Sequence, residues 1–183
     1  MPGNWLDKWF RPDGNALGVL RIDYIGLYNA GYRLVLLDID NTLVPHGQDR
    51  PDPTAAETVH RILKAGLACI VVSNARSSRS RIFCERLGVT CVPGAGKPST
   101  RGVLRACSLA GVDPVRTVLI GDQLFTDIAA ARRAGCASIR VQPLDPSEPF
   151  YIYIKRLFER PLIRRFHLEK PYLSLPSPIS RRS

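Results

Sequence analysis

Residues 33–42, RLVLLDIDNT, join an uninterrupted apolar run to two closely spaced acids. Such a run is typical of a strand that is buried in a parallel sheet. Asp38 and Asp40 follow it directly, and burying carboxylates without a partner is expensive. Both side chains can point into one loop cavity, where Mg²⁺ is the natural partner of paired carboxylate oxygens. The alternative is a helix cap or an Asx turn at the end of the strand.

Short β-branched runs and helix-like stretches alternate through the rest of the chain. Further strands are predicted at 68–72, 90–92, 117–120 and 137–141, and helices at 53–65, 78–87, 99–110 and 126–134. This alternation predicts the α/β class, a Rossmann-like open parallel sheet of about five strands with helices on both faces. Ligands of such sheets bind outside the carboxyl ends of the strands, so functional residues are expected just after each apolar run.

Polar residues stand at three further strand ends. Ser73 and Asn74 follow the second strand, where a hydroxyl and backbone N–H groups can hold a phosphate oxygen, although a helix N-cap is the simpler interpretation. Lys97, in GAGKP, can supply a point charge to a phosphoryl group, although a single exposed lysine is usually only solvated. The fourth strand ends in GDQLFTD, which carries Asp122 and Asp127. Separate structural roles, such as helix caps, turns and a solvated lysine, do not explain why polar residues follow all four strands in this order.

The order of these residues resembles the haloacid dehalogenase (HAD) superfamily of phosphohydrolases, whose motifs are DxD, Ser or Thr, Lys, and an acid cluster of the GDxxxxD type. The segments DIDNTLVP, VSNA, AGKP and GDQLFTDI, with the lead-in DYIGLYNAGYR, are similar to its YqeG-like, type IIIA branch. That branch includes phosphatidylglycerophosphate phosphatases, and the resemblance covers about residues 19–145. Ala75 departs from the pattern, since relatives often carry a second Asn there; we expect this to affect substrate contacts rather than phosphoryl chemistry.

The resemblance implies a Mg²⁺-dependent phosphatase that works through an aspartyl-phosphate. Asp38 would be the nucleophile, while Asp40 would protonate the leaving alkoxide and later deprotonate water. The role of Asp40 is efficient only if its pKa lies above that of an ordinary Asp. The resemblance also implies that Ser73, Asn74 and Lys97 bind the substrate, that Asp38, the backbone carbonyl of Asp40 and Asp122 bind Mg²⁺, and that Asp127 either binds the metal or orients Lys97.

One catalytic domain, residues 19–145, is predicted between two ends of different composition. A HAD cap domain would be inserted between Asp40 and Ser73 or between Ser73 and Lys97. Both intervals hold little beyond one helix, so a capless HAD fold is expected.

The two ends are expected to form separate segments. Residues 1–18 form an amphipathic lead-in, with Trp5, Leu6, Trp9 and Phe10 on one helical face. Residues 146–170 are a basic, apolar extension in which Pro161 is expected to break or restart any helix. Residues 171–183 are predicted to be a disordered tail.

Charge and cysteine content limit the partners and the compartment. Lys and Arg number 26 against 16 Asp and Glu, a net charge of +10 that favours phosphate-rich partners. No apolar run reaches the ~18 residues of a membrane span, and the N-terminus lacks a signal peptide's apolar region. Five scattered cysteines without a CxxC pair argue against a zinc site or a disulfide framework. We therefore predict a cytoplasmic protein with peripheral contact at the inner membrane surface.

The leading substrate hypothesis is the phospholipid headgroup of phosphatidylglycerophosphate. A capless site can accept a headgroup presented by a membrane, and both ends combine cations with apolar side chains. The alternative is that these ends pack against the domain or against a second subunit, and the oligomeric state is left open. A second enzyme hypothesis is a soluble phosphatase acting on a nucleotide, a sugar phosphate or a phosphoprotein.

A nucleic-acid-associated protein is a remote alternative. It is suggested by basic residues on one predicted helix, namely Arg76, Arg79, Arg81 and Arg86. No aromatic stacking platform accompanies these charges, so nucleic acid is disfavoured as a partner. The three histidines, His46, His60 and His167, show no metal-ligand spacing and are interpreted as surface or helix residues.

Overall fold

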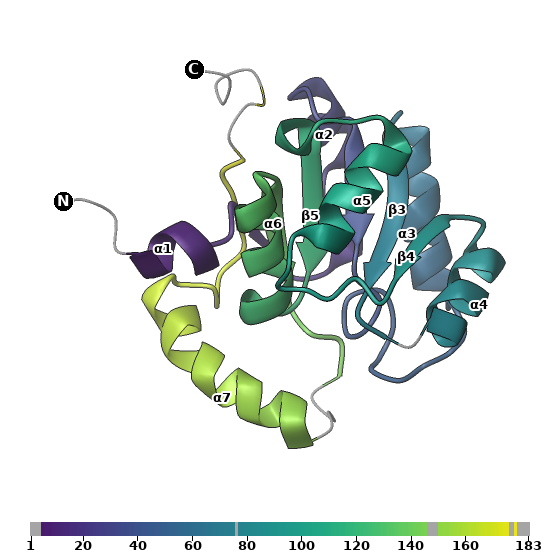
Figure 1. Ribbon diagram of the computed structural model, residues 1–183. Coiled ribbons are helices and arrows are strands. Elements are labelled where there is room, and N and C mark those ends of the chain that lie inside the picture. The colour runs from purple at the N-terminus through teal and green to yellow at the C-terminus, as the bar shows by residue number, and fades with distance from the viewer. Residues whose placement is uncertain (1–4, 76, 146–149, 176–177, 179–183) are drawn as a thin grey trace.

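A seven-stranded, mostly parallel sheet forms the centre of the protein. The computed structural model describes residues 5–75, 77–145, 150–175 and 178 (Figure 1). The strand order is β4-β3-β2-β5-β6-β1-β7. The strands span Gly14–Ala16 (β1), Leu34–Leu37 (β2), Ala68–Ser73 (β3), Thr90–Pro93 (β4), Thr117–Gly121 (β5), Ala137–Val141 (β6) and Tyr172–Leu173 (β7). The five predicted strands, β2 to β6, are confirmed, as is the α/β class.

The register of the three central strands determines where the site lies. Leu37 of β2 pairs in parallel with Val71 of β3 and with Ile120 of β5. The polar residues that follow these strands therefore emerge at the same edge of the sheet. Parallel pairing thus brings together residues that are far apart in the sequence.

Helices cover both faces of the sheet, as predicted. One core cluster packs α2 (Tyr24–Asn29), α3 (Pro53–Lys64) and α4 (Ser77–Leu87) against Val35 and Leu37. The other packs α5 (Arg101–Ala110) and α6 (Ala129–Ala134) against Leu34 and Leu36. Shorter turns are η1 (Val19–Arg21), η2 (Pro114–Arg116) and the π-helical η3 (Leu124–Ile128). Among the described residues, α3 is the only helix between β2 and β3, and α4 is the only helix between β3 and β4, so the fold is capless.

Two strands were not predicted. Strand β1 pairs in parallel with β6, and β7 pairs antiparallel with β1. They are short, and β1 has the sequence GNA, which carries no β-branched signal. Asn15 of β1 donates two hydrogen bonds to the carbonyls of Leu168 and Lys170, which holds the C-terminal segment beside the sheet.

Strand β7 corrects the expectation of a disordered tail from residue 171. Tyr172 pairs with β1, and its hydroxyl donates to the carbonyl of Pro12 at 2.9 Å. The rest of that expectation falls partly on residues 176–177 and 179–183, which lie outside the described residues. The proposed division into lead-in, catalytic domain, extension and tail otherwise stays a prediction.

Helix α7 (Phe150–Arg165) runs through Pro161, so the expected break is wrong. Proline cannot donate the backbone hydrogen bond of a helix interior, but contacts on both sides hold the helix in place. Glu159 accepts a hydrogen bond from the N–H of Phe125 at 2.9 Å, and Leu162 is buried in a small core cluster with Leu124 and Ile128. Figure 1 shows α7 along one side of the molecule, with α1 near its C-terminal end.

The N-terminal helix α1 (Trp5–Phe10) packs mainly against the domain. Leu6 and Phe10 contact the small core cluster, and Phe10 meets Phe125 edge-on with ring centroids 5.2 Å apart. Trp5 is exposed, and Trp9 lies beside Lys8 and Arg133. For Leu6 and Phe10, the alternative that the chain ends pack against the domain therefore holds.

The five cysteines are free thiols; Cys91 is half-buried and the other four are buried. Among the described residues, no helix combines the length and the apolar composition that crossing a membrane requires.

Replacing Gly102 by Ala is expected to destabilise the protein by about 1–3 kcal/mol, because the new Cβ would lie 2.6 Å from the carbonyl oxygen of Ala95. This steric cost outweighs the gain of about 1 kcal/mol that Ala normally brings to a helix. Urea unfolding measures the change. Ser108→Ala, on the exposed side of the same helix, is the control, with a change within about 0.5 kcal/mol. A Gly102→Ala protein as stable as the parent would contradict this packing.

Candidate active site

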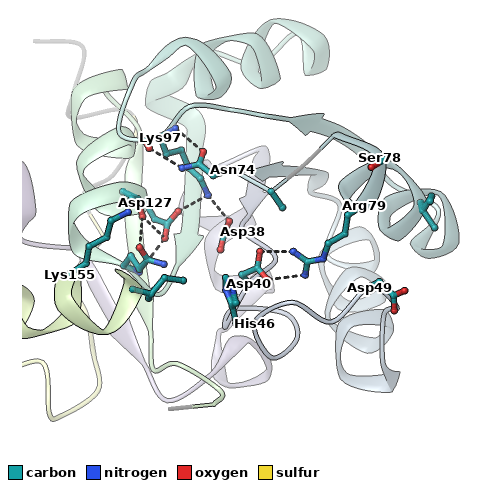
Figure 2. A pocket seen from close by; sticks show the side chains of 15 residues that line it. Asp38, Asp40, His46, Asp49, Asn74, Ser78, Arg79, Lys97, Asp127 and Lys155 are labelled. Carbon is teal, nitrogen blue, oxygen red and sulfur yellow. Dashed lines mark hydrogen bonds and ion pairs between the residues drawn. The ribbon is translucent and has the colours of Figure 1, made fainter. Parts of the chain in front are cut away.

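Lys97 lies between two buried carboxylates at the carboxyl edge of the sheet. Its Nζ is 2.6 Å from Oδ1 of Asp38 and 2.6 Å from Oδ1 of Asp127. All three residues are buried, and Figure 2 shows the lysine reaching between the two acids. A buried charge is tolerated only when it is paired and hydrogen-bonded, and these contacts provide that pairing. The structure thus brings together three residues predicted from separate motifs.

The position of Asp127 depends on the glycine at the end of β5. A Cβ on Gly121 would lie 2.4 Å from Cγ of Asp127, so any larger residue would displace the carboxylate. The other oxygen of Asp127, Oδ2, accepts a hydrogen bond from the N–H of Gln123 at 3.1 Å. The π-helical segment η3 therefore holds this carboxylate with one oxygen directed at Lys97.

Asn74 positions the backbone of Lys97 through two hydrogen bonds. Its Nδ2 donates to the carbonyl of Lys97 at 2.9 Å, and its Oδ1 accepts from the N–H of Lys97 at 2.8 Å. Both backbone polar groups of the lysine are therefore satisfied by one side chain. Asn74 also lines the cavity described below.

Ser73 is buried at the end of β3, and its Oγ accepts a hydrogen bond from the N–H of Ala75 at 3.0 Å. Ser73 is not among the described residues that line the cavity. The predicted contact between Ser73 and a phosphoryl group stays a prediction.

Asp40 is paired with Arg79 of α4, which sequence reasoning did not anticipate. The two guanidinium nitrogens lie 2.8 Å from the two carboxylate oxygens, and the N–H of Gly47 donates to Oδ1 at 2.9 Å. The ring of His46 is also close, with its Nδ1 3.6 Å from the carboxylate. The carboxylate is therefore held by groups from two directions.

These contacts correct the expected pKa of Asp40. Burial favours the neutral acid, but the hydrogen bonds from Arg79 and Gly47, with the charges of Arg79 and His46, outweigh it and hold the pKa below its usual value. The expectation that the pKa of Asp40 would be raised is wrong for this form of the protein. Asp40 is an ionised carboxylate while Arg79 remains paired with it.

Asp38 has the opposite electrostatic environment. Burial raises its pKa to about 7, and the nearby Asp127 carboxylate adds to this rise, while the Lys97 ammonium opposes it. For Lys97, burial favours the neutral amine, but the charges of Asp127 and Asp38 outweigh it and hold the pKa above its usual value. The lysine therefore remains positively charged.

Asp122 completes a cluster of carboxylates that fits a divalent cation. Carboxylate oxygens of Asp38, Asp122 and Asp127 lie within 4.8 Å of one another. The residue is fully buried; its Oδ2 pairs with Arg156 of α7, while its Oδ1 has no hydrogen-bond partner among the described residues. Burial and the charge of Asp127 raise its pKa, while Arg156 opposes the rise. Hard oxygen donors with an unsatisfied buried lone pair are what a hard divalent cation requires.

A cavity of about 710 Å³ opens over these residues. Asp38, Asp40, Lys97 and Asp127 line it, whereas Asp122 lies beneath its surface. Figure 2 shows Arg79 and Lys155 on opposite sides of Asp38, so cations flank this carboxylate. A cavity lined by both carboxylates and cations is suited to an anionic ligand bound through a metal.

The residues of the site that sequence reasoning missed include His46, Arg79, Lys155 and Arg156. His46 was interpreted as a surface residue, yet it lines the cavity, whereas His60 and His167 are exposed. Arg79 was grouped with a possible nucleic-acid surface, but it pairs with Asp40; Arg76 lies outside the described residues. No local pattern marks Arg79 and Arg156, because each pairs with an acid of a distant segment.

Residues 44–135 match the family of haloacid dehalogenase-like hydrolases, a segment that is half of the chain. The chain belongs to this family. The predicted family is thereby confirmed, and the names of its relatives support the predicted phosphatase class. Asp38 and Asp40 precede the matched segment, so their place in the site rests on the geometry above.

Two named relatives extend over most of the chain. A Bacillus subtilis protein named "Probable phosphatase YqeG" is 29% identical over 168 residues, which cover 90% of this chain and 98% of the relative. The chloroplastic phosphatidylglycerophosphate phosphatase 1 of Chlamydomonas reinhardtii is 26% identical over 161 residues, covering 82% of this chain and 60% of the relative. A solved structure of an uncharacterized Listeria monocytogenes protein is similar in fold, with a TM-score of 0.52 and 18% identity over 64% of this chain and 85% of that one.

Replacing Arg79 by Gln is expected to raise the pKa of Asp40, because the group that opposes the effect of burial is removed. The measurement is a pH titration of the Asp40 carboxyl ¹³C signal in the metal-free protein. Arg81→Gln, an exposed position on the same helix, is the matched control and should leave the titration unchanged. An unaltered Asp40 titration in Arg79→Gln would show that the ion pair does not control this carboxylate.

Proposed function

We propose that this chain is a Mg²⁺-dependent phosphomonoester hydrolase that works through an aspartyl-phosphate, with phosphatidylglycerophosphate as its substrate. The observation that carries the proposal is the position of Lys97, which lies 2.6 Å from Asp38 in a cavity flanked by Arg79 and Lys155. A nucleophilic carboxylate beside a fixed cation is suited to attack on a phosphoryl group, whose oxygens carry the charge.

Asp38 attacks phosphorus through a carboxylate oxygen, and the bond to the leaving alkoxide breaks. Lys97 holds a phosphoryl oxygen, and Ser73 and Asn74 support the neighbouring oxygens and the loop. Asp127 orients Lys97 through the contact at 2.6 Å. Covalent catalysis divides the hydrolysis into two easier steps, since water later cleaves the acyl phosphate.

Asp40 protonates the alkoxide and then accepts a proton from the attacking water. In the present form Arg79 occupies both oxygens of Asp40, so this proton transfer requires the guanidinium to move away. An anionic substrate in the cavity offers Arg79 a second partner, which would release Asp40 and let its pKa rise. Substrate binding is thereby coupled to the protonation of Asp40.

The residues that would hold Mg²⁺ are Asp38, Asp122 and the backbone carbonyl of Asp40. Mg²⁺ bound there would neutralise phosphoryl charge and keep Asp38 ionised. The unsatisfied Oδ1 of Asp122 and the three converging carboxylates support this assignment.

The phospholipid substrate is supported by the similarity to the chloroplast phosphatase and by the capless fold. With no inserted domain over it, the cavity can receive a headgroup that remains attached to a bilayer. The proposed place of action is the cytoplasmic face of the membrane.

Phosphate release from phosphatidylglycerophosphate in mixed micelles with Mg²⁺ tests this proposal. Asp38→Asn should abolish turnover with the fold intact, because the amide cannot act as the nucleophile, and EDTA should abolish turnover of the parent. Glu85→Gln, an exposed loss of one carboxylate on α4, should retain activity.

Two results would contradict different parts of the proposal. Turnover that survives in Asp38→Asn, or in EDTA, would refute the mechanism. Hydrolysis of an aryl phosphate but not of the lipid would refute the substrate and favour a soluble phosphomonoester.

A further inference from the structure

Helix α7 carries apolar side chains on two opposite sides. Its inner side packs on the domain through Ile152 and Leu162, both of them buried. A second apolar set faces away from the domain and consists of Phe150, Tyr153, Ile154, Leu157 and Phe158. We call this set the outer face of α7. Its spacing of three and four residues places it along one stripe of the helix.

The outer face is exposed to an extent that is unusual for such residues. Phe150 is 76% exposed and Phe158 is 69% exposed. Single exposed apolar residues are ordinary, but a contiguous stripe on one helix marks an interaction surface. Because the inner side already packs α7 against the domain, the outer face is not required for that packing.

The charges on α7 indicate the partner. Lys155, Arg160 and Arg164 are exposed on the helix, and Arg165 is exposed and pairs with Asp7 at 3.1 Å. The only acid in α7, Glu159, is buried and accepts the N–H of Phe125. The helix therefore offers apolar and cationic groups to its surroundings, with no exposed carboxylate of its own. This combination is typical of helices that lie in the interface of an anionic bilayer.

A second copy of the chain fits this surface less well. A two-fold contact through the outer face would bring the cations of one helix close to the cations of its partner. An anionic lipid surface instead meets them with opposite charge. The observations therefore favour a bilayer over self-association.

Helix α7 also borders the active-site cavity. Ile152 and Lys155 line the cavity, and Arg156 pairs with Asp122. Figure 2 shows Lys155 extending from α7 toward the site. Because a helix with its side chains is about 10–12 Å across, the cavity lies close to any surface on which α7 rests.

We propose that the outer face of α7 docks the protein on an anionic bilayer and so holds the cavity, which borders the other side of the helix, close to the membrane surface. The proposal rests on the phosphatase function above for its purpose, but the binding does not require turnover. It assigns membrane contact to α7 and not to α1, whose Leu6 and Phe10 are turned toward the domain.

Flotation of the full chain with vesicles tests the docking. Vesicles of phosphatidylcholine with phosphatidylglycerol should carry the protein at low salt, pure phosphatidylcholine should carry much less, and binding should weaken as salt rises. Phe158→Asp should lower partitioning by at least about tenfold, because an apolar group is lost and a negative charge faces the lipid. Leu109→Asp on α5, with the same charge change at another exposed apolar position, should bind as the parent does.

The outcomes separate the docking proposal from the proposed function. Equal flotation of Phe158→Asp and the parent would overturn the docking proposal, as would a dimer in solution that Phe158→Asp dissociates without any vesicle binding. Hydrolysis of an aryl phosphate should be equal in the parent, Phe158→Asp and Leu109→Asp, which shows that the variants are folded. If none of the three proteins, the parent included, hydrolyses the aryl phosphate, the phosphatase mechanism is refuted, while the flotation result is unaffected.

Discussion

The contact of Lys97 with Asp38 and Asp127 is the interaction on which the rest of the site depends. Both carboxylates are buried, and Lys97 supplies the positive charge that makes their burial tolerable. Asp38 directly follows β2, Asp127 lies in η3 after β5, and Lys97 lies in the loop after β4, so the contact forms only when the strands are in register. Asn74 and Gly121 serve the same contact, one by holding the lysine backbone and the other by leaving space for Asp127.

Two arginines extend this charge pairing to the other acids. Arg79 of α4 neutralises Asp40, and Arg156 of α7 neutralises Asp122, so each of the four acids has a cationic partner within the described residues. The two arginines come from elements on different sides of the cavity. A metal would compete with Arg156 for Asp122, and an anionic substrate would compete with Asp40 for Arg79. Removing these pairs must therefore accompany binding, and the cost is recovered only by a ligand that supplies its own charges.

The sequence was sufficient to predict the centre of the fold and the four motifs. Asp38, Lys97, Asp122 and Asp127 were predicted because parallel strands bring their carboxyl ends to one edge, and that rule depends only on local apolar runs. Arg79 and Arg156 could not be predicted, since they lie 39 and 34 residues from their partners and act through tertiary packing. The same pairing reversed the expected pKa of Asp40. Strands β1 and β7 were too short to leave a pattern, and Pro161 remained helical because packing of Glu159 and Leu162 outweighs its local preference.

The central claim is that Asp38 receives the phosphoryl group beside Lys97. A crystal structure of the full chain with Mg²⁺ and beryllofluoride, which mimics a phosphoryl group bound to a carboxylate, tests it most directly. The account predicts the beryllium bonded to a carboxylate oxygen of Asp38, a fluorine in contact with Nζ of Lys97, and Arg79 withdrawn from Asp40. Beryllofluoride on another residue, or at Asp38 with Lys97 out of contact, would contradict it.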